Sequence, residues 1–561
     1  MTTDKKTVSL LTDIFVKKGL REIVLSPGSR NAPLVLSFTG HPDVKPVSVI
    51  DERSAAFFAL GIAQKTQRAV AIACTSGSAV LNYAPAIAEA YYQKIPLLVL
   101  TADRPPHLID VGDGQTIRQN NVFANYIKKS YSLPLEMTSE KEKQKINRLI
   151  NEAIDLTQFP EPGPVHINLP LDEPLYNLTH IPETGTIIKS ENSLPELSEE
   201  TVQTFVRHWR QSRKTLILAG QKNFSEKLNR ILEYLSGFRQ VALLTETTSN
   251  LFSPAFMDEI DNLITAIPEK ALTEFQPDLL ITFGTAVVSK KIKKLLRTYP
   301  ARKHWHLSIS GEKRDTYFCL THVATSQAED FLAAVKDKLT ENESTYRNFW
   351  QKRKQQVLQK RNRFLSTIGW CDLKVYDILF REIPGNSYLH LGNSTPVRYA
   401  QLFGSLPKFR YFSNRGVSGI DGQVSTAAGF AFAAPDVINT VITGDIGFFY
   451  DSNALMNHYL SPNLKIIVIN NGGGDIFRFI PGPDTSAQRE PFFATAHNWK
   501  AEKIAQAFDI IYFSAGNETE LSAVLSAFYA EREHPALLEI FTREKENAAV
   551  LKKYFNFLKA L

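Results

Sequence analysis

Short apolar runs alternate with longer amphipathic stretches along the whole chain. Apolar runs bounded by turn residues are typical of buried strands, and the stretches between them have the residue spacing of helices. Strands that alternate with helices form parallel sheets covered by those helices. In the first part of the chain we predict strands at 23–25, 47–50, 69–74 and 97–101, and helices at 53–65 and 79–93.

The same alternation recurs twice more. The next group of predicted strands is 215–219, 241–245, 279–283 and 304–308. The last group is 388–391, 439–443, 464–469, 510–513 and 536–541, followed by a helix at 544–560. The fold class predicted from this pattern is α/β, with three doubly wound parallel-sheet domains.

The length of 561 residues is too great for a single hydrophobic core. Residues 181–200 are polar, with proline and glycine but little periodicity, which is typical of a linker. Residues 345–365 have the pattern of a long basic helix that connects to the last domain. We therefore predict a first domain at 1–180, a central domain at 201–365 and a last domain at 366–561.

Composition narrows the classes of function. Apolar residues make up 43% and charged residues 22%, as in soluble globular proteins. The net charge of +6 is small for this length, and the basic clusters follow helix faces, so nucleic-acid binding is not indicated. Three widely separated cysteines, no apolar core of a signal peptide and no membrane-spanning run predict a cytoplasmic protein without membrane contact.

Candidate chemistry lies at the ends of two neighbouring predicted strands. The strand at 439–443 ends in Gly444-Asp445, a helix is predicted at 451–460, and the strand at 464–469 ends in Asn470-Asn471. A helical crossover makes the two strands parallel, so both ends lie at the same edge of the sheet. A carboxylate, an amide oxygen and a backbone carbonyl suit Mg²⁺ holding a diphosphate. Taken singly, each dipeptide is equally well explained as a helix cap.

This spacing resembles a known cofactor motif. An Asp after Gly, followed 26 positions later by the second Asn of an Asn-Asn pair, is similar to the diphosphate-anchoring motif of thiamine diphosphate (ThDP) enzymes. Ile446 stands where that motif usually has a further glycine. The resemblance implies ThDP as cofactor, bordered by Gly444 and Ile446, with Mg²⁺ or Mn²⁺ held by Asp445, Asn471 and Gly473.

ThDP enzymes also require a glutamate, from another domain, that activates the aminopyrimidine ring of the cofactor. Glu52 follows the second predicted strand and begins a helical stretch. In isolation it is explained as an acidic residue in the first turn of a helix. Together with the diphosphate motif, the resemblance implies that Glu52 is the activating, catalytic carboxylate.

Longer blocks give a more specific resemblance. The blocks are SPGSRNAPL (26–34), DERSAAFFALGIA (51–63), TSGSAVLNYAPAIAEA (75–90), TADRPP (101–106) and GQTIRQ (114–119). They resemble the 2-succinyl-5-enolpyruvyl-6-hydroxy-3-cyclohexene-1-carboxylate synthase family of menaquinone biosynthesis. The resemblance implies a ThDP-dependent transferase that decarboxylates 2-oxoglutarate and adds the succinyl unit to isochorismate.

The family's functional positions can be assigned one by one. The resemblance implies catalytic roles for Ser29, Arg30 and Gln115, and substrate contacts for Arg104, Lys290, Ser394, Arg398 and Arg415. It implies that Ser394 and Ile420 also contact the cofactor, and that Ile476, Phe477 and Ile480 form an apolar wall. Each has an ordinary alternative: the arginines can form surface ion pairs, Lys290 can be a solvated residue of a helix start, and Ile420 can be part of the core.

Other functions stay open on the sequence alone. They are a different ThDP-dependent 2-keto acid decarboxylase, an acetohydroxyacid synthase-like enzyme and a non-catalytic ThDP-binding regulator. The lack of a His-His pair counts against a simple decarboxylase, and intact Glu52, Asp445 and Asn471 count against a regulator. The resemblance further implies a homodimer or a dimer of dimers, in which one chain provides Glu52 and its partner the diphosphate site. His166, within an apolar strand, is predicted to be a core histidine.

Overall fold

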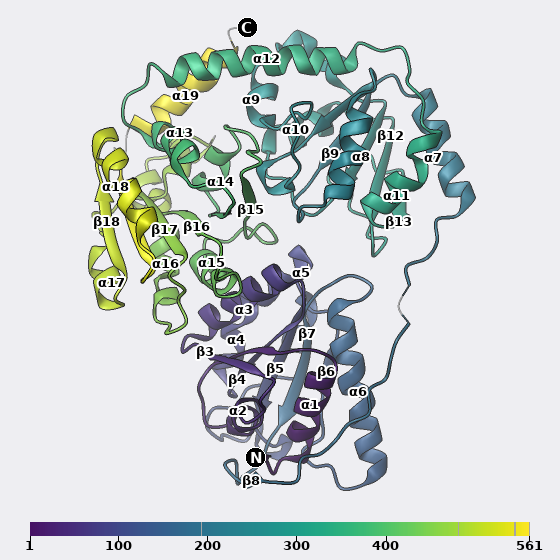
Figure 1. Ribbon diagram of the computed structural model, residues 1–561, viewed down its shortest axis with the longest axis vertical. Helices are drawn as coiled ribbons and strands as arrows, with labels where there is room; N and C mark the ends of the chain where they lie inside the picture. The colour runs from purple at the N-terminus through teal and green to yellow at the C-terminus, as the bar shows by residue number, and fades with distance from the viewer. Residues whose placement is uncertain (192, 481, 543–545, 560–561) are drawn as a thin grey trace.

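The computed structural model describes residues 1–191, 193–480, 482–542 and 546–559. It contains three parallel sheets, each covered by helices, as Figure 1 shows. The predicted α/β fold with several doubly wound parallel-sheet domains is therefore confirmed. The described helices include none that is both long enough and apolar enough to cross a bilayer.

The first sheet has the strand order β3-β2-β4-β5-β7-β6. Its strands are β2 (Glu22–Leu25), β3 (Lys45–Ser48), β4 (Val70–Cys74), β5 (Leu97–Asp103), β6 (Ser130–Ser132) and β7 (Val165–Pro170). One face packs against α1 (Lys6–Lys17), α2 (Ala32–Thr39) and α6 (Glu140–Gln158). The other face packs against α3 (Glu52–Thr66), α4 (Ser78–Asn82) and α5 (Ala84–Gln93). A short pair, β1 (Thr2–Thr3) with β8 (Leu178–Thr179), joins the ends of this domain.

The central sheet has the order β10-β9-β11-β12-β13. Its strands are β9 (Thr215–Ala219), β10 (Val241–Leu244), β11 (Leu279–Phe283), β12 (Lys303–Ser308) and β13 (His322–Thr325). Its helices are α7 (Glu199–Gln211), α8 (Glu226–Ser236), α9 (Ile260–Thr265), α10 (Lys290–Thr298) and α11 (Ala328–Val335). The long helix α12 (Tyr346–Leu365) then spans from this domain to the last one (Figure 1).

The last sheet has the order β15-β14-β16-β17-β19-β18. Its strands are β14 (Ser387–Leu391), β15 (Phe409–Phe412), β16 (Asn439–Gly444), β17 (Leu464–Asn470), β18 (Ile511–Ala515) and β19 (Ala536–Phe541). Its helices are α13 (Asp372–Glu382), α14 (Thr395–Ala400), α15 (Gln423–Phe432), α16 (Asp445–Tyr450), α17 (Glu502–Ala507), α18 (Glu518–Ala530) and α19 (Glu546–Lys559). Counted along the chain within each sheet, the first and last sheets share the order 2-1-3-4-6-5.

Helices α3 and α15 join the first and last domains at a very close crossing. A Cβ atom added to Gly61 would lie 2.0 Å from the Thr426 carbonyl oxygen, and one added to Gly429 would lie 1.9 Å from the Phe58 carbonyl oxygen. Around these glycines, one continuous apolar cluster includes side chains of both helices and of both sheets. The two domains are therefore packed backbone to backbone at this point.

Several predicted elements differ from the structure. The helix predicted at 451–460 is wrong: α16 begins at Asp445, and only a short 3-10 turn follows at Ser452–Leu455. Asn457 and His458 in the remainder, and Pro462 just after it, favour an irregular connection. The predicted strand 47–50 is β3, which ends at Ser48, so Ile50 lies outside it and is exposed. The helix predicted at 79–93 is divided between α4 and α5 at Tyr83.

Five short strands were not predicted: β1, β6, β8, β13 and β15. Of these, β6, β13 and β15 are edge strands with polar or charged residues among their few positions, so they lack a continuous apolar signal. Two further predictions are only partly covered by the described residues. Residues 544, 545 and 560 of the predicted terminal helix lie outside the described residues. The described part of 181–198 contains no helix or strand and runs as an extended segment (Figure 1). The domain limits at 180, 200 and 365 remain predictions.

We expect Gly61→Ala to destabilise the protein, although alanine normally favours a helix over glycine. The new methyl group would clash with backbone, and overpacking of this kind typically costs about 1–3 kcal/mol. A Cβ added to Gly369 meets nothing within 4 Å, so Gly369→Ala is the matched control. Thermal melting compares the two variants. Equal melting temperatures would mean that α3 and α15 do not need their close crossing.

Candidate active site

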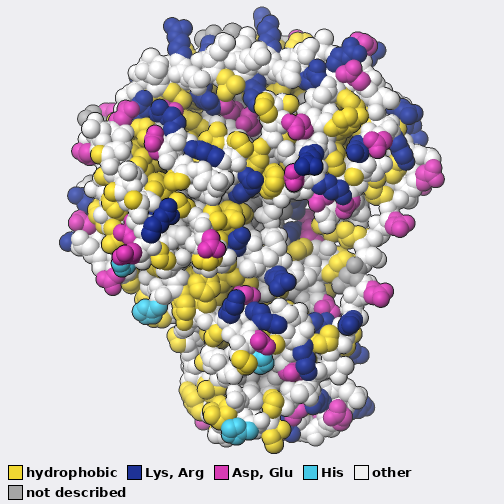
Figure 2. All heavy atoms as spheres, viewed as in Figure 1, with side chains coloured by type: hydrophobic (Ala, Val, Ile, Leu, Met, Phe, Trp, Pro, Cys, Tyr) yellow, Lys and Arg dark blue, Asp and Glu magenta, His cyan; other side chains and the backbone are white. Residues whose placement is uncertain are grey.

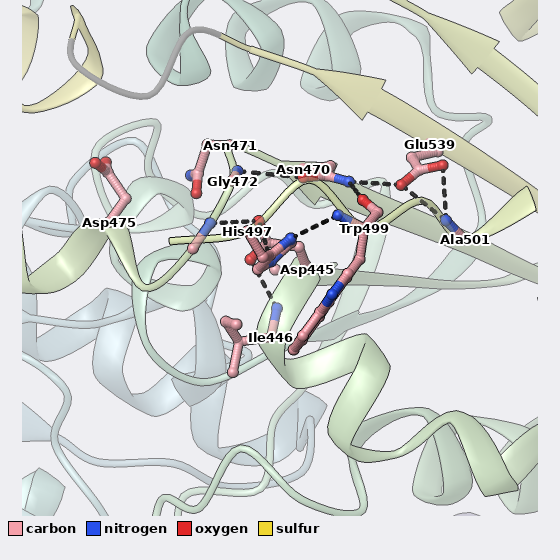
Figure 3. Close-up of polar contacts among 12 residues, drawn as sticks. Asp445, Ile446, Asn470, Asn471, Gly472, Asp475, His497, Trp499, Ala501 and Glu539 are labelled. Atoms are coloured by element: carbon pink, nitrogen blue, oxygen red, sulfur yellow. Dashed lines mark hydrogen bonds and ion pairs between the residues drawn. The ribbon is translucent and has the colours of Figure 1, made fainter. Parts of the chain in front are cut away.

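Asp445 and the glycine loop after β17 are brought together at one edge of the last sheet. β16 and β17 are parallel neighbours, with Gly444 opposite Ile469. The Asp445 carboxylate accepts hydrogen bonds from the backbone N–H groups of Gly473 (2.9 Å) and Ile446 (2.7 Å). Gly473 has a φ of +144°, and a Cβ there would lie 2.6 Å from the Ala494 carbonyl oxygen. The position therefore requires glycine. Figure 3 shows Asp445 with Ile446 and with Asn470 and Asn471 at the end of β17.

The two asparagines at the end of β17 have different surroundings. The Asn470 amide donates to Glu539 (2.7 Å) and to the Trp499 carbonyl oxygen (2.9 Å), which anchors the strand end. The Asn471 amide donates to Asp372 (2.9 Å). The other side-chain atom of Asn471, Oδ1, is buried and has no hydrogen-bond partner. Asn471 therefore presents an unsatisfied acceptor beside Asp445.

A cluster of buried polar groups surrounds this acceptor. Burial raises the pKa values of Asp372 and Asp475, and neighbouring carboxylates add to the increase. His497 accepts a hydrogen bond at Nδ1 from the Trp499 N–H, so its proton is on Nε2, which lies 3.4 Å from Asp445 Oδ2. Crowded buried carboxylates favour binding of a cation.

The available donors fit a hard cation. Among the described residues, no group of three or more His, Cys, Asp or Glu side chains is arranged to hold a metal ion. A cation here would instead be held by the Asp445 carboxylate, Asn471 Oδ1 and backbone oxygen of the glycine loop. Mg²⁺ and Mn²⁺ accept such mixed oxygen ligands, with water or phosphate completing the shell.

The first domain contributes a second group of polar side chains at the ends of β2, β4 and β5. Arg30 is buried and donates from Nη1 to the Leu171 carbonyl oxygen (2.9 Å). Burial lowers the pKa of Arg30, and the nearby Arg104 lowers it further. The Nε atoms of both arginines are buried without a hydrogen-bond partner. Gln115 donates to the Ser76 carbonyl oxygen (3.2 Å), while Ser29 is exposed beside Arg30.

Glu52 begins α3, where Asp51 is the N-cap and accepts from the Ser54 N–H (3.0 Å). The Glu52 carboxylate is partly exposed and accepts from the Asn82 amide (3.3 Å). Within the described residues of this one chain, no hydrogen bond or ion pair joins Glu52 to Asp445, Asn471 or Gly473.

A third cationic group lies between the central and last domains. Arg415 is buried, donates from Nη1 to Asn393 (2.7 Å), and has a buried Nε without a partner. Arg398 donates to the Ser394 carbonyl oxygen, and burial, with Arg415 nearby, lowers its pKa to about 10. Arg415 and Lys293 line a cavity of about 260 Å³. Lys290 is exposed at the start of α10, one helical turn before Lys293.

The predicted apolar residues lie close to the glycine loop. Ile420 is half-buried, and its carbonyl oxygen would be 3.6 Å from a Cβ on Gly447, which places it beside α16. Ile476 and Phe477 belong to a 3-10 turn at Asp475–Arg478, and the Ile480 N–H donates to the Ile476 carbonyl oxygen (3.1 Å). All four side chains are only partly buried, so each retains surface for a ligand.

Comparison with known proteins agrees with this arrangement. Residues 5–124 match the family described as thiamine pyrophosphate enzyme, N-terminal TPP binding domain, and residues 392–540 match its C-terminal TPP binding domain. Thiamine pyrophosphate is another name for ThDP. The chain is 42% identical to the 2-succinyl-5-enolpyruvyl-6-hydroxy-3-cyclohexene-1-carboxylate synthase of Christiangramia forsetii, over 97% of each chain. The chain belongs to this synthase family.

Further relatives in the synthase family also match over nearly the whole length of both chains. The synthase of Flavobacterium johnsoniae is 42% identical over 97% of this chain and 98% of its own length. That of Porphyromonas gingivalis is 39% identical over 99% and 98%, respectively. The resemblance inferred from the sequence blocks is thereby confirmed, and the chain is a ThDP-dependent enzyme. Individual roles of the predicted site residues remain predictions.

Sequence reasoning did not identify several residues that lie around the predicted site. Asp372 and His497 are distant in sequence from Asn471 and Asp445, which they contact, and Lys293 lies within an ordinary helix. The usable signals were the place of Asp475 directly after the glycine run and the spacing of Lys293 after Lys290 on one helix. His166 is confirmed as a core histidine: it is buried between Thr101 (2.7 Å) and Ser130 (3.1 Å), and burial lowers its pKa to about 3.

Proposed function

We propose that the chain decarboxylates 2-oxoglutarate and adds the remaining four-carbon unit to isochorismate. The products are 2-succinyl-5-enolpyruvyl-6-hydroxy-3-cyclohexene-1-carboxylate and CO₂, in menaquinone biosynthesis. The observation that carries this proposal is a set of three arginines, Arg30, Arg104 and Arg415, whose buried Nε atoms all lack hydrogen-bond partners. Both substrates are dicarboxylates, and guanidinium groups with free donors are suited to binding them.

The cofactor and cation would be held at the edge of the last sheet. Asp445, Asn471 and the backbone of Gly473 would hold Mg²⁺ or Mn²⁺ against the diphosphate, with Gly444 and Ile446 alongside. When bound, ThDP supplies the nucleophilic carbon that permits loss of CO₂ from the keto acid and transfer of the succinyl unit. Ile420 and Ser394 would support the ring system of the cofactor.

The remaining residues act on protons and carboxylates. Glu52 would hydrogen-bond N1′ of the aminopyrimidine ring and hold the proton that activates the cofactor. Arg30, Arg104, Arg398, Arg415 and Lys290 would bind substrate carboxylates. Ser29 and Gln115 would position the reacting groups, while Ile476, Phe477 and Ile480 would exclude water.

We further propose a cytoplasmic homodimer, or a dimer of dimers, in which Glu52 faces the diphosphate site of the partner. Strongly exposed apolar side chains lie around Glu52: Ile50 is 55% exposed, and Leu81, next to the Asn82 that donates to Glu52, is 49% exposed. Tyr450, whose carbonyl oxygen accepts from Arg53, is 53% exposed. Figure 2 shows hydrophobic side chains gathered where the first domain meets the last. Exposed apolar surface of this kind is typical of an interface between proteins.

The function is tested by CO₂ release from 2-oxoglutarate in the presence of ThDP and Mg²⁺, with and without isochorismate. We expect fast release only when both substrates are present. Release from pyruvate would instead indicate another keto acid decarboxylase. No release from any mixture would favour a regulator that binds ThDP without turnover.

Glu52→Gln should lower turnover by roughly 10²- to 10⁴-fold, because it removes a proton-transfer group. The melting temperature should stay close to that of the wild type, since Glu52 is partly exposed and forms a single hydrogen bond within the chain. Turnover near the wild-type value would exclude Glu52 as the activating carboxylate.

A mixing experiment checks the dimer in the same assay. When inactive Glu52→Gln and Asp445→Asn proteins are refolded together, each mixed dimer has one intact site if Glu52 and Asp445 come from different chains. Random pairing should then restore about a quarter of the wild-type sites. No recovery would place both residues of a site in the same chain.

Asp445→Asn and Asn471→Ala should raise the Mg²⁺ concentration needed for half-maximal ThDP binding by at least about 10-fold, because each removes a proposed ligand. Calorimetric titration of ThDP at several Mg²⁺ concentrations measures the change. The matched control is Asp436→Asn, at an exposed aspartate of the same domain. Unchanged Mg²⁺ dependence in both site variants would show that the cation binds elsewhere.

A further inference from the structure

Glu89 of α5 lies in the first domain but binds a loop of the last domain. Its side chain is 1% exposed and accepts hydrogen bonds from the backbone N–H groups of Gly416 (2.6 Å) and Val417 (2.8 Å). A Cβ added to Gly416 would lie 2.7 Å from the Glu89 carbonyl oxygen, so helix and loop are in direct contact. Glu89 therefore fixes the two residues that follow Arg415.

The central domain contributes to the same contact. The Gln93 amide donates to Glu89 (2.6 Å), and the Gln221 amide donates both to Gln93 (2.9 Å) and to the Ser413 carbonyl oxygen (2.8 Å). Gln221 follows β9 of the central sheet. The loop from Ser413 to Val417 is thus held by side chains of the first and central domains, on both sides of Arg415.

The charge of Glu89 fits this role. Burial raises its pKa, while the two backbone N–H groups, Gln93 and the nearby Arg415 oppose that increase. The carboxylate is held by three N–H donors, and the described residues include no cation within ion-pair distance of it. Burying a carboxylate costs free energy unless hydrogen bonds compensate. The contact with the Gly416 and Val417 N–H groups therefore explains why Glu89 is buried here.

We propose that Glu89 is a positioning residue: it holds the Arg415 guanidinium in the orientation that binds a substrate carboxylate. Arg415 donates from Nη1 to Asn393, which leaves its buried Nε as a free donor. The direction of that donor follows from the backbone of the loop, which Glu89 and Gln221 fix. This inference rests on the proposed function for the identity of the carboxylate, but not for the contact itself.

The test combines two measurements on the Glu89→Gln variant. Glutamine has nearly the same size as glutamate, but it has only one side-chain oxygen, so it can no longer accept from both backbone N–H groups through separate oxygens. Hydrogen exchange followed by mass spectrometry should show faster exchange in the peptide that contains Gly416 and Val417. The KM of one dicarboxylate substrate should rise about 10- to 100-fold, with a smaller change in kcat, because a displaced guanidinium binds more weakly. The affinity for ThDP should not change. Glu136→Gln, at an exposed glutamate of the same domain, is the matched control for both measurements.

A double-mutant comparison separates positioning from a general structural role. In an Arg415→Lys background, Glu89→Gln should have little further effect on KM, since the group that it positions has been replaced. Additive effects, or equal losses in kcat, KM and ThDP affinity, would overturn the proposal. Unchanged hydrogen exchange would overturn it regardless of activity. If the wild-type protein is inactive with both substrates, the proposed function is wrong. Hydrogen exchange of the peptide with Gly416 and Val417 would still decide whether Glu89 holds the loop.

Discussion

The crossing of α3 and α15 is the contact on which the arrangement of this enzyme depends. Gly61 and Gly429 let the two backbones approach so closely that no side chain separates them. Helix α3 begins at Glu52, and α15 follows directly after the loop that contains Arg415 and Ile420. Because both helices are buried in one apolar cluster, neither can shift without repacking its neighbour. The relative position of these proposed site residues within the chain is thereby set by rigid elements.

The first and last sheets place the proposed site residues at equivalent points. Their strand orders are identical, and the switch in direction lies beside β2 in one sheet and β14 in the other. Ligands of doubly wound sheets bind at the carboxyl ends of strands near that switch. Arg30 and Ser394 follow these two strands. Glu52 and Arg415 follow the next strand along the chain in each sheet, and Asp445 follows the third strand of the last sheet.

The sequence predicted those features that depend on local pattern. β9, β11 and β19 have the predicted bounds because apolar residues dominate each run, and the Asp445 to Asn471 spacing follows from two adjacent parallel strands. The polar edge strands β6 and β13 lack that signal. Asp372 contacts Asn471 from 99 positions away, and Glu89 contacts Val417 from 328 positions away. Such pairs are created by tertiary packing, so no local pattern indicates them.

Under the proposed function, the buried carboxyl groups around Asn471 would couple cofactor supply to the lifetime of the protein. Asp372, Asp445 and Asp475 lie close enough for their charges to repel, and Asn471 Oδ1 adds a further unsatisfied oxygen. A cation that binds only the folded state stabilises it by mass action. Cells short of magnesium or thiamine would then hold a larger share of this enzyme in locally opened forms, which proteases degrade first. The abundance of the enzyme would follow its cofactors without any dedicated regulator.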